Sequence, residues 1–400
     1  MSILDWLTTG LLDFSAWELV LYTLAVTHVT IVSVTVYLHR YSSHRSLELH
    51  PALKHFFRFW LWLTTGMVTR EWTAIHRKHH AQCETEEDPH SPVMKGIGEI
   101  FWRGAEAYAE STKDASIMAR YGAGCPDDWV EREIYDKRRS HGLALMAIID
   151  VALFGVIGLT VWAIQMIWIP LFAAGVINGI GHWWGYRNFE CPDAARNIVP
   201  WGILIGGEEL HNNHHTYPNS AKLSAKPFEI DLGWGWIKLF SALGLAKVRS
   251  TGPVVARVEG KDTIDKDAAW ALVNDRFRVM ARYTEEVLKP ALEAEYVKAD
   301  QASRKVIRRA RRVLHREVSL VDQRGRERIA ALVERSSDIK VAYELQENLR
   351  AIWAKRGGNV DEMIAALGEW CKSAEASGQQ TLREFAETLK SYATPVAARA

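Results

Sequence analysis

The sequence His-Arg-Lys-His-His at residues 76–80 returns as His-Asn-Asn-His-His at residues 211–215. Both copies carry histidines at relative positions 1, 4 and 5, and residues with this spacing share one face of an α-helix. Imidazole is the commonest side-chain ligand of metal ions in proteins. Each copy therefore predicts a short helix that directs three imidazoles at one place.

Three further histidines extend this pattern along the chain. A hydrolytic zinc site typically needs three protein ligands and one open position, so nine clustered imidazoles exceed that need. A pair of redox metals with open positions for dioxygen fits better, and iron is the expected metal. The candidate ligands are His39, His44, His76, His79, His80, His182, His211, His214 and His215.

The spacing of the remaining ligands also makes predictions about local structure. A regular helix would splay His39 and His44 by about 140°, so we expect the helix to end near His39 and the chain to turn before His44. Asn178 precedes His182 by four residues, so both can face the site from one helix. Asn178 is a poor direct ligand but could hold a metal-bound water. His28 stands alone in an apolar stretch and is not counted as a ligand.

Long apolar stretches place this chemistry at a membrane. Residues 18–38, 143–162 and 164–181 are each long enough to span a bilayer, and the last two predict a hairpin. Residues 53–69 are apolar but carry basic residues at one end. A full crossing there would separate the first two histidine groups, so we expect an interfacial or re-entrant helix. Arg40 and Arg45 favour a cytoplasmic exit of the first span.

Charge and cysteine content exclude several classes of protein. The formal net charge is +1, which argues against a nucleic-acid binder held by bulk charge, and no nucleic-acid partner is expected. Four cysteines, with no Cys-x-x-Cys pair, exclude a rubredoxin-like or iron–sulfur segment within this sequence. Electrons for a redox reaction must then come from a separate protein.

The second part of the chain has a different composition. Residues 253–400 are rich in Ala, Glu, Lys, Arg and Leu with helical periodicity, which predicts a separate soluble helical region of unknown role. Its basic run at 305–312 is more typical of a solvated helix face than of a contact with anionic lipid. Residues 332–392 are loosely similar to the C-terminal helical part of certain bacterial transposases, without a catalytic carboxylate set. The predicted fold is all-α, with a membrane domain at 1–252.

Five motifs together resemble one known family, the membrane-bound fatty acyl desaturases of the Δ9, stearoyl-CoA type, in a bacterial form. The resemblance covers roughly residues 15–250. The motifs are His-Arg-Tyr-Ser-Ser-His-Arg (39–45), Glu-Trp-x3-His-Arg-Lys-His-His (71–80), Glu-Thr-x2-Asp-Pro-His (84–90), Asn-Gly-Ile-Gly-His-x2-Gly-Tyr-Arg-Asn (178–188) and Gly-Glu-Glu-Leu-His-Asn-Asn-His-His-Thr-Tyr-Pro (207–218).

The resemblance implies a di-iron oxidoreductase of lipid metabolism in the inner membrane, with its histidines on the cytoplasmic side. It implies that the nine histidines bind two irons, that Asn178 acts through water, and that zinc can replace iron in purified protein. Dioxygen and two electrons from a ferredoxin, rubredoxin or cytochrome-like donor would introduce a cis double bond into a saturated acyl chain. His90 matches a family histidine outside the ligand set. Thr23 and Thr27 match positions near the closed end of the acyl tunnel.

Three carboxylates are candidates for a supporting role. Metal-bound imidazoles usually donate their outer N–H to a carboxylate, and Asp88, Glu208 and Glu209 lie near the ligands in sequence. Plain surface or ion-paired carboxylates are an equally good interpretation of these residues.

One departure from the family pattern leaves the substrate open. Animal stearoyl-CoA enzymes carry an Arg-Asp pair before the first histidine of the second motif, and this chain carries Ala74-Ile75. Acyl-CoA and a membrane phospholipid are therefore both candidate substrates. Two other functions remain as alternatives: an alkane or lipid hydroxylase of the same superfamily, and a membrane protein that only stores metal.

Overall fold

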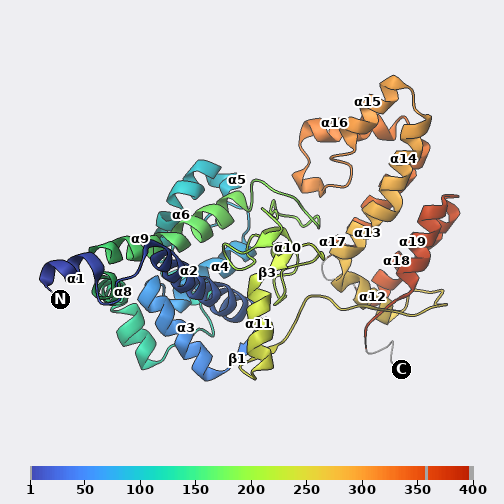
Figure 1. Ribbon diagram of the computed structural model, residues 1–400. Coiled ribbons are helices and arrows are strands. Elements are labelled where there is room, and N and C mark those ends of the chain that lie inside the picture. The colour runs from blue at the N-terminus through green and yellow to red at the C-terminus, as the bar shows by residue number, and fades with distance from the viewer. Residues whose placement is uncertain (1, 356–358, 396–400) are drawn as a thin grey trace. The chain divides into compact units, whose positions relative to one another are not determined.

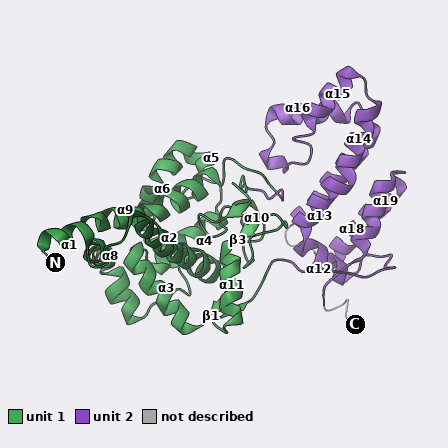
Figure 2. Ribbon diagram, viewed as in Figure 1, with its two compact units in different colours: residues 1–187, 193–252 green, residues 188–192, 253–400 purple. Residues whose placement is uncertain are grey.

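The structure is a computed structural model that describes residues 2–355 and 359–395. Its described residues form helices and three two-stranded sheets, so the predicted all-α fold is confirmed. Two compact units can be distinguished (Figure 2). The first comprises residues 1–187 and 193–252, and the second comprises residues 188–192 and 253–400.

The first unit is built on a long apolar helix. Helix α2 (Ala16–Val32) begins with a capping box, in which Ser15 and Glu18 each accept a hydrogen bond from the other's backbone N–H. It runs directly into a π-helix, η1 (Ser33–Ser43). Together they form 28 residues that are long and apolar enough to cross a membrane. This helix extends five residues beyond the predicted end at 38.

A second apolar segment, 139–180, forms a hairpin. Helix α8 (Arg139–Phe154) and helix α9 (Gly158–Ile169) are joined by a 3-10 turn, η3 (Gly155–Ile157), and α9 continues into a π-helix, η4 (Pro170–Ile180). Gly155 has φ +68°, and a Cβ on Gly158 would collide with the carbonyl of Asp150. In a straight helix, residues 150 and 158 would be about 12 Å apart. Because they lie in contact instead, the chain reverses here. The expected reversal near residue 163 is wrong.

Between these apolar elements lies the expected interfacial helix. Helix α3 (Pro51–Thr64) is amphipathic, burying Phe57 and Leu61 while Phe56 and Phe59 are each 43% exposed. Its 14 residues are fewer than the roughly 20 that a span requires. An interfacial position for α3 stays a prediction that its length favours.

The segment between α4 (Thr69–Ala81) and α8 packs partly against the apolar hairpin. It contains α5 (Pro92–Lys95), α6 (Ile97–Ser111), α7 (Ala115–Tyr121) and a π-helix, η2 (Glu131–Asp136). A Cβ on Gly104 of α6 would lie 2.6 Å from the carbonyl oxygen of Ala174. The two helices approach this closely because glycine has no side chain at the crossing.

The remaining elements of this unit include the two histidine helices, α4 and α10. They are α1 (Ile3–Thr9), β1 (Leu47–Leu49), α4 (Thr69–Ala81), β2 (Trp201–Gly202), α10 (His211–Thr216), β3 (Ile230–Asp231), α11 (Leu232–Ala242) and β4 (Ala246–Val248). Figure 1 shows these elements along the chain. Strands β1 and β4 pair antiparallel, and β2 and β3 pair in parallel.

The C-terminal unit has its own core. Tyr283, Trp370 and Phe385 pack edge to face at its centre, with ring centroids 5.0–6.2 Å apart. Its elements are β5 (Ala256–Arg257), α12 (Lys266–Asn274), α13 (Arg276–Tyr283), η5 (Thr284–Leu288), α14 (Lys289–Lys298), α15 (Gln301–Ala310), η6 (Val318–Leu320), α16 (Gln323–Val333), α17 (Ser337–Ala354), α18 (Val360–Ala376), α19 (Gln380–Lys390) and β6 (Tyr392–Ala393).

The side chain of Arg40 is buried in the first unit, with 1% exposure. Its guanidinium forms two contacts with the Asp231 carboxylate, at 2.8 and 3.2 Å. It also donates to the carbonyl oxygens of Gly206 and Ala221. Arg40 therefore ties η1, which carries His39, to the segments on either side of α10.

Replacing Arg40 should destabilise the first unit strongly. In Arg40→Gln the Asp231 carboxylate stays buried without its cation, which costs about 3–5 kcal/mol. Thermal unfolding of the purified protein in detergent measures this change. Arg249→Gln is the control, because Arg249 pairs with Glu48 at the surface and such pairs contribute about 0–1 kcal/mol. Equal unfolding temperatures for the two variants would contradict this role of Arg40.

Candidate metal centre

His39 lies in η1, and His44 is the residue directly after its C-terminal end. The backbone N–H of His44 donates to the carbonyl of His39 at 3.1 Å, an i→i+5 bond. In a π-helix residues five apart return to nearly the same face, and such segments are frequent at functional sites. The predicted turn between the two histidines is therefore wrong. The π-helix brings both imidazoles to one side without a turn.

Helix α4 carries the second histidine group and is fixed against η1 by polar contacts. The hydroxyls of Ser42 and Thr73 lie 2.7 Å apart. Arg77, on the same helix, donates to the carbonyl oxygens of Ser42 and Ser43 at 2.7 and 3.1 Å. These contacts set the position of α4, so that its histidines face those of η1.

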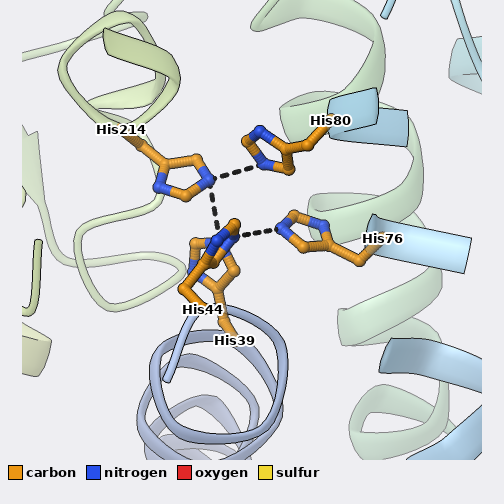
Figure 3. Close-up of side chains that lie close together, drawn as sticks. All are labelled: His39, His44, His76, His80 and His214. Atoms are coloured by element: carbon orange, nitrogen blue, oxygen red, sulfur yellow. Dashed lines mark hydrogen bonds between the residues drawn. The ribbon is translucent and has the colours of Figure 1, made fainter. Parts of the chain in front are cut away.

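Five imidazoles from three segments form the first group, the five-histidine cluster (Figure 3). One nitrogen from each ring lies within 4.8 Å of the others. The Nε2 atoms are 3.0 Å apart for His39 and His214, 2.8 Å for His44 and His76, and 2.8 Å for His80 and His214. The members are His39, His44, His76, His80 and His214.

The other four candidate ligands form a second group, the four-histidine cluster of His79, His182, His211 and His215. Ligand atoms of His79, His182 and His215 lie within 4.8 Å of one another. The Nε2 atom of His211 is 3.1 Å from that of His182. The rings of His80 and His215 are stacked with centroids 4.4 Å apart, so the two clusters are adjacent. All nine predicted histidines thus come together.

Two residues outside the predicted set also lie at the four-histidine cluster. The sulfur of Cys83 is 4.0 Å from Nε2 of His79 and belongs to the same group of possible ligand atoms. His90 is buried and its ring stacks on His79 at 4.4 Å. Sequence reasoning did not select Cys83, because a lone cysteine has no spacing signal.

The electrostatic environment favours the neutral form of six of these imidazoles. Burial lowers the pKa of His44, His76 and His80 well below its ordinary value, and the neighbouring imidazoles lower it further. The same causes act on His211, His214 and His215. A neutral imidazole has one nitrogen with a free lone pair, which is the form that binds metal.

The nitrogen spacing also fits metal ions. Imidazole nitrogen binds zinc, for example, at about 2.0–2.1 Å, and two such ligands at a right angle are then about 3.0 Å apart. The observed Nε2 separations of 2.8–3.1 Å agree with this value. Nε2 of His215 is buried and has no hydrogen-bond partner among the described residues. The two clusters therefore have the composition and geometry of a metal site.

Four carboxylates hold the outer nitrogens of four of these rings. Glu208 lies 2.7 Å from Nδ1 of His39, and Asp88 lies 3.0 Å from Nδ1 of His79, in the positions expected for a supporting role. Sequence reasoning missed two others: Glu84 lies 3.1 Å from Nδ1 of His182, and Asp193 lies 3.3 Å from Nδ1 of His215. Glu84 could have been found, because it begins the Glu-Thr-x2-Asp-Pro-His motif.

The third predicted carboxylate has a different role. Glu209 accepts hydrogen bonds from the backbone N–H groups of Leu204, Ile205 and Gly207, and contacts no imidazole among the described residues. The expectation for Glu209 is therefore not met. Burial raises the pKa of Glu209 above its ordinary value. Burial would also raise that of Glu208, but the nearby His39 and Arg40 outweigh it and the pKa is lowered.

An apolar cavity of about 450 Å³ adjoins both clusters. His39, His76, His211 and Asn178 line one part of it, so Asn178 faces the same space as the ligands. Thr23 and Thr27 are not among the residues that line this cavity, and their place in an acyl tunnel stays a prediction. Apolar residues of η1, α4, α9 and η4 supply most of the wall, among them Val34, Ile75, Met166, Ile169, Ala173 and Ile177.

Comparison with known proteins identifies the first unit. A family model described as fatty acid desaturase matches residues 15–225. The chain is 31% identical over 268 residues to an sn-2 palmitoyl-lipid 9-desaturase of Nostoc, covering 64% of this chain and 86% of that protein. An sn-1 stearoyl-lipid 9-desaturase of Synechocystis is 31% identical over 54% of this chain and 66% of that protein. A probable chloroplastic lipid desaturase of Arabidopsis thaliana is 33% identical over 54% of this chain, which spans 59% of its length.

The C-terminal unit matches a different family model. Residues 267–400 match a model described as transposase. This agrees with the loose similarity expected for residues 332–392. No function follows for this unit, because the sequence shows no transposase catalytic carboxylate set.

Removing a supporting carboxylate should weaken metal binding without unfolding the chain. Asp88→Asn should lower metal affinity about 10–100-fold, because His79 loses the partner that orients its ring. Metal content after dialysis against a chelator series measures the change. The control is Glu87→Gln, one residue away and exposed. Unchanged metal retention in Asp88→Asn would contradict the supporting role.

Proposed function

Because this chain belongs to the fatty acid desaturase family, we propose that it is a membrane-bound Δ9 desaturase that introduces a cis double bond into a saturated acyl chain of a lipid. The observation that carries the proposal is the pair of adjacent imidazole clusters beside an apolar cavity. An enzyme that oxidises an unactivated methylene group needs both: a redox-metal site and a dry space that holds a hydrocarbon chain next to it.

The residues that would hold the metals divide into two sets. The five-histidine cluster would bind one iron, and the four-histidine cluster would bind the other, with Asn178 acting through a water molecule. Zinc could fill the same nitrogen sites in purified protein. When bound, the two irons supply the activation of dioxygen and the removal of two hydrogens from neighbouring carbons.

The chain's own residues would orient the imidazoles, align the acyl chain and exclude water from the cavity. Asp88, Glu84, Asp193 and Glu208 hold the outer nitrogens of four rings, which fixes the direction in which the inner lone pairs point. The apolar wall of the cavity excludes water and would align the acyl chain beside the clusters. Asn178, at the boundary between the wall and the ligands, would hold a water that a purely apolar wall would not.

The acyl donor is proposed to be a membrane lipid rather than acyl-CoA. Ala74 and Ile75, which stand where the animal enzymes carry a charged pair, are 0% and 1% exposed. Ile75 lines the cavity, so these positions offer no charge to a CoA headgroup. The names of the relatives from Nostoc and Synechocystis also describe lipid-linked acyl chains.

We also propose where the enzyme is located and which kind of protein supplies its electrons. Residues 1–252 would form a membrane domain in the inner membrane, with the histidines on the cytoplasmic side. Two electrons per turnover would come from a separate ferredoxin, rubredoxin or cytochrome-like protein. Residues 253–400 would form a separate helical domain.

Expression in a host that lacks its own desaturase tests the reaction. The native chain should give lipids whose acyl chains have lost two hydrogens, with the double bond at carbon 9 by mass spectrometry. His80→Ala and His215→Ala each remove a ligand and should lower product by at least about 100-fold. The control His55→Ala changes an exposed histidine on α3 and should keep activity. Gain of one oxygen in the product would instead indicate the hydroxylase.

The form of the substrate can be tested with purified enzyme. Labelled stearoyl-CoA and labelled distearoyl phosphatidylcholine are supplied separately, with the same donor and reductase. The phospholipid should be converted at a rate at least about ten times that of the thioester, a difference of about 1.4 kcal/mol in favour of the lipid. Conversion of the thioester alone would contradict the lipid assignment and leave the desaturase assignment intact.

A further inference from the structure

A second cavity, of about 470 Å³, lies within the C-terminal unit, and we call it the cationic cavity. It is bordered by η5, α14, α15 and the turn that follows α15. Three arginines, one lysine and one histidine line it together with three leucines and a threonine. They are Thr284, Leu288, Lys289, Leu292, Arg308, Arg311, Arg312, Leu314 and His315.

The three arginines come from one face of the chain. Arg308, Arg311 and Arg312 have the spacing i, i+3 and i+4, which stacks their side chains on one side of the helix and its last turn. All three are exposed. Guanidinium groups held this close repel one another, and the cavity would be more stable with an anion between them.

Among the residues that the structure describes, no carboxylate supplies that anion. Lys289 is paired with Glu285 at 2.6 Å. Across residues 2–355 and 359–395, however, no carboxylate lies within ion-pair distance of Arg308, Arg311 or Arg312. Residues 301–335 carry eleven Lys and Arg against four Asp and Glu, a net charge of +7, whereas the whole chain carries +1. The segment that carries the three arginines is thus strongly cationic.

The side chains that line the cationic cavity indicate which kind of anion it would bind. Arginine forms paired hydrogen bonds to phosphate oxygens, so three free guanidiniums suit a phosphoryl group. Leu288, Leu292 and Leu314 offer an apolar wall beside it. We propose that the cationic cavity binds the phosphoryl headgroup of an anionic phospholipid, with the leucines against the adjoining glycerol and upper acyl carbons.

A lipid fits these observations better than a nucleic acid does. A duplex presents its phosphates along a hydrophilic backbone and has no apolar part for the three leucines. The first unit contains segments long enough to cross a membrane, so the same chain has lipid phosphates at high effective concentration. This choice of lipid rests on the proposed membrane location but not on the desaturase chemistry.

The test measures binding by the full-length protein in a neutral maltoside detergent. Calorimetric titration with short-chain phosphatidylglycerol is compared with short-chain phosphatidylcholine, inorganic phosphate and a short DNA duplex. Phosphatidylglycerol should bind at least about tenfold more tightly than the other three. R308Q/R311Q/R312Q should weaken that binding about tenfold or more, and the matched variant R309Q/R324Q/R328Q, which removes the same charge outside the cavity, should change it less than about threefold.

Three outcomes would overturn the proposal. Equal weakening in the two triple variants would mean diffuse attraction without a site. Equal affinity for inorganic phosphate would mean an anion site that does not recognise lipid, and tighter binding of the duplex would mean a nucleic-acid surface. If a triple variant fails to fold, Arg312→Gln and Arg324→Gln give the same comparison. Desaturation is not part of the readout, so failure here is distinguishable from failure of the proposed enzyme activity.

Discussion

The convergence of nine imidazoles in two adjacent clusters is the constraint on which the rest of the first unit depends. The nine rings are buried or partly buried in the first unit. Burial together with the neighbouring rings lowers the pKa of six of them. An assembly of this kind leaves several lone pairs without donors, which is unfavourable unless a cation accepts them. The π-helix η1, the clamp of Arg40 on Asp231 and the four carboxylates all serve to keep the rings converged. These features are therefore best understood as parts of one metal-binding framework.

The sequence predicted which residues would meet but not how the backbone would bring them together. Membership of the desaturase family and the all-α fold are confirmed, because paired histidine motifs and long apolar stretches are strong patterns. The predicted turn before His44 is wrong because a regular helix was assumed, and a π-helix brings residues five apart to one face. The hairpin reverses at Gly155–Gly158 rather than near residue 163, because glycine geometry determined the turn and not the flanking hydropathy.

Side-chain partners were predicted less well than ligands. Asp88 and Glu208 contact imidazoles, but Glu209, adjacent to Glu208, caps the backbone of residues 204–207 instead. Neighbouring residues on a turn point in different directions, and sequence proximity alone does not distinguish them. Glu84 and Asp193 reach their histidines across long sequence separations. Contacts between residues so far apart in sequence depend on tertiary packing, which the spacing of residues along the chain does not predict.

The two units differ in the chemistry of their interiors and cavities. The first combines apolar helices with a buried nitrogen-rich centre, and the second combines a compact aromatic core with a strongly cationic cavity. If the proposals hold, one unit would modify the hydrocarbon part of a lipid and the other would recognise its charged part. Such a division would account for a membrane enzyme that carries a helical domain similar in sequence to part of a transposase.

The central claim is that the histidines bind two metal ions, so the most direct measurement is the number of metal ions bound per chain. Protein produced with iron and purified without chelator should contain two ions per polypeptide by elemental analysis. X-ray absorption should show imidazole nitrogen as the main ligand of both ions. A single ion per chain, or none in a folded sample, would contradict the account.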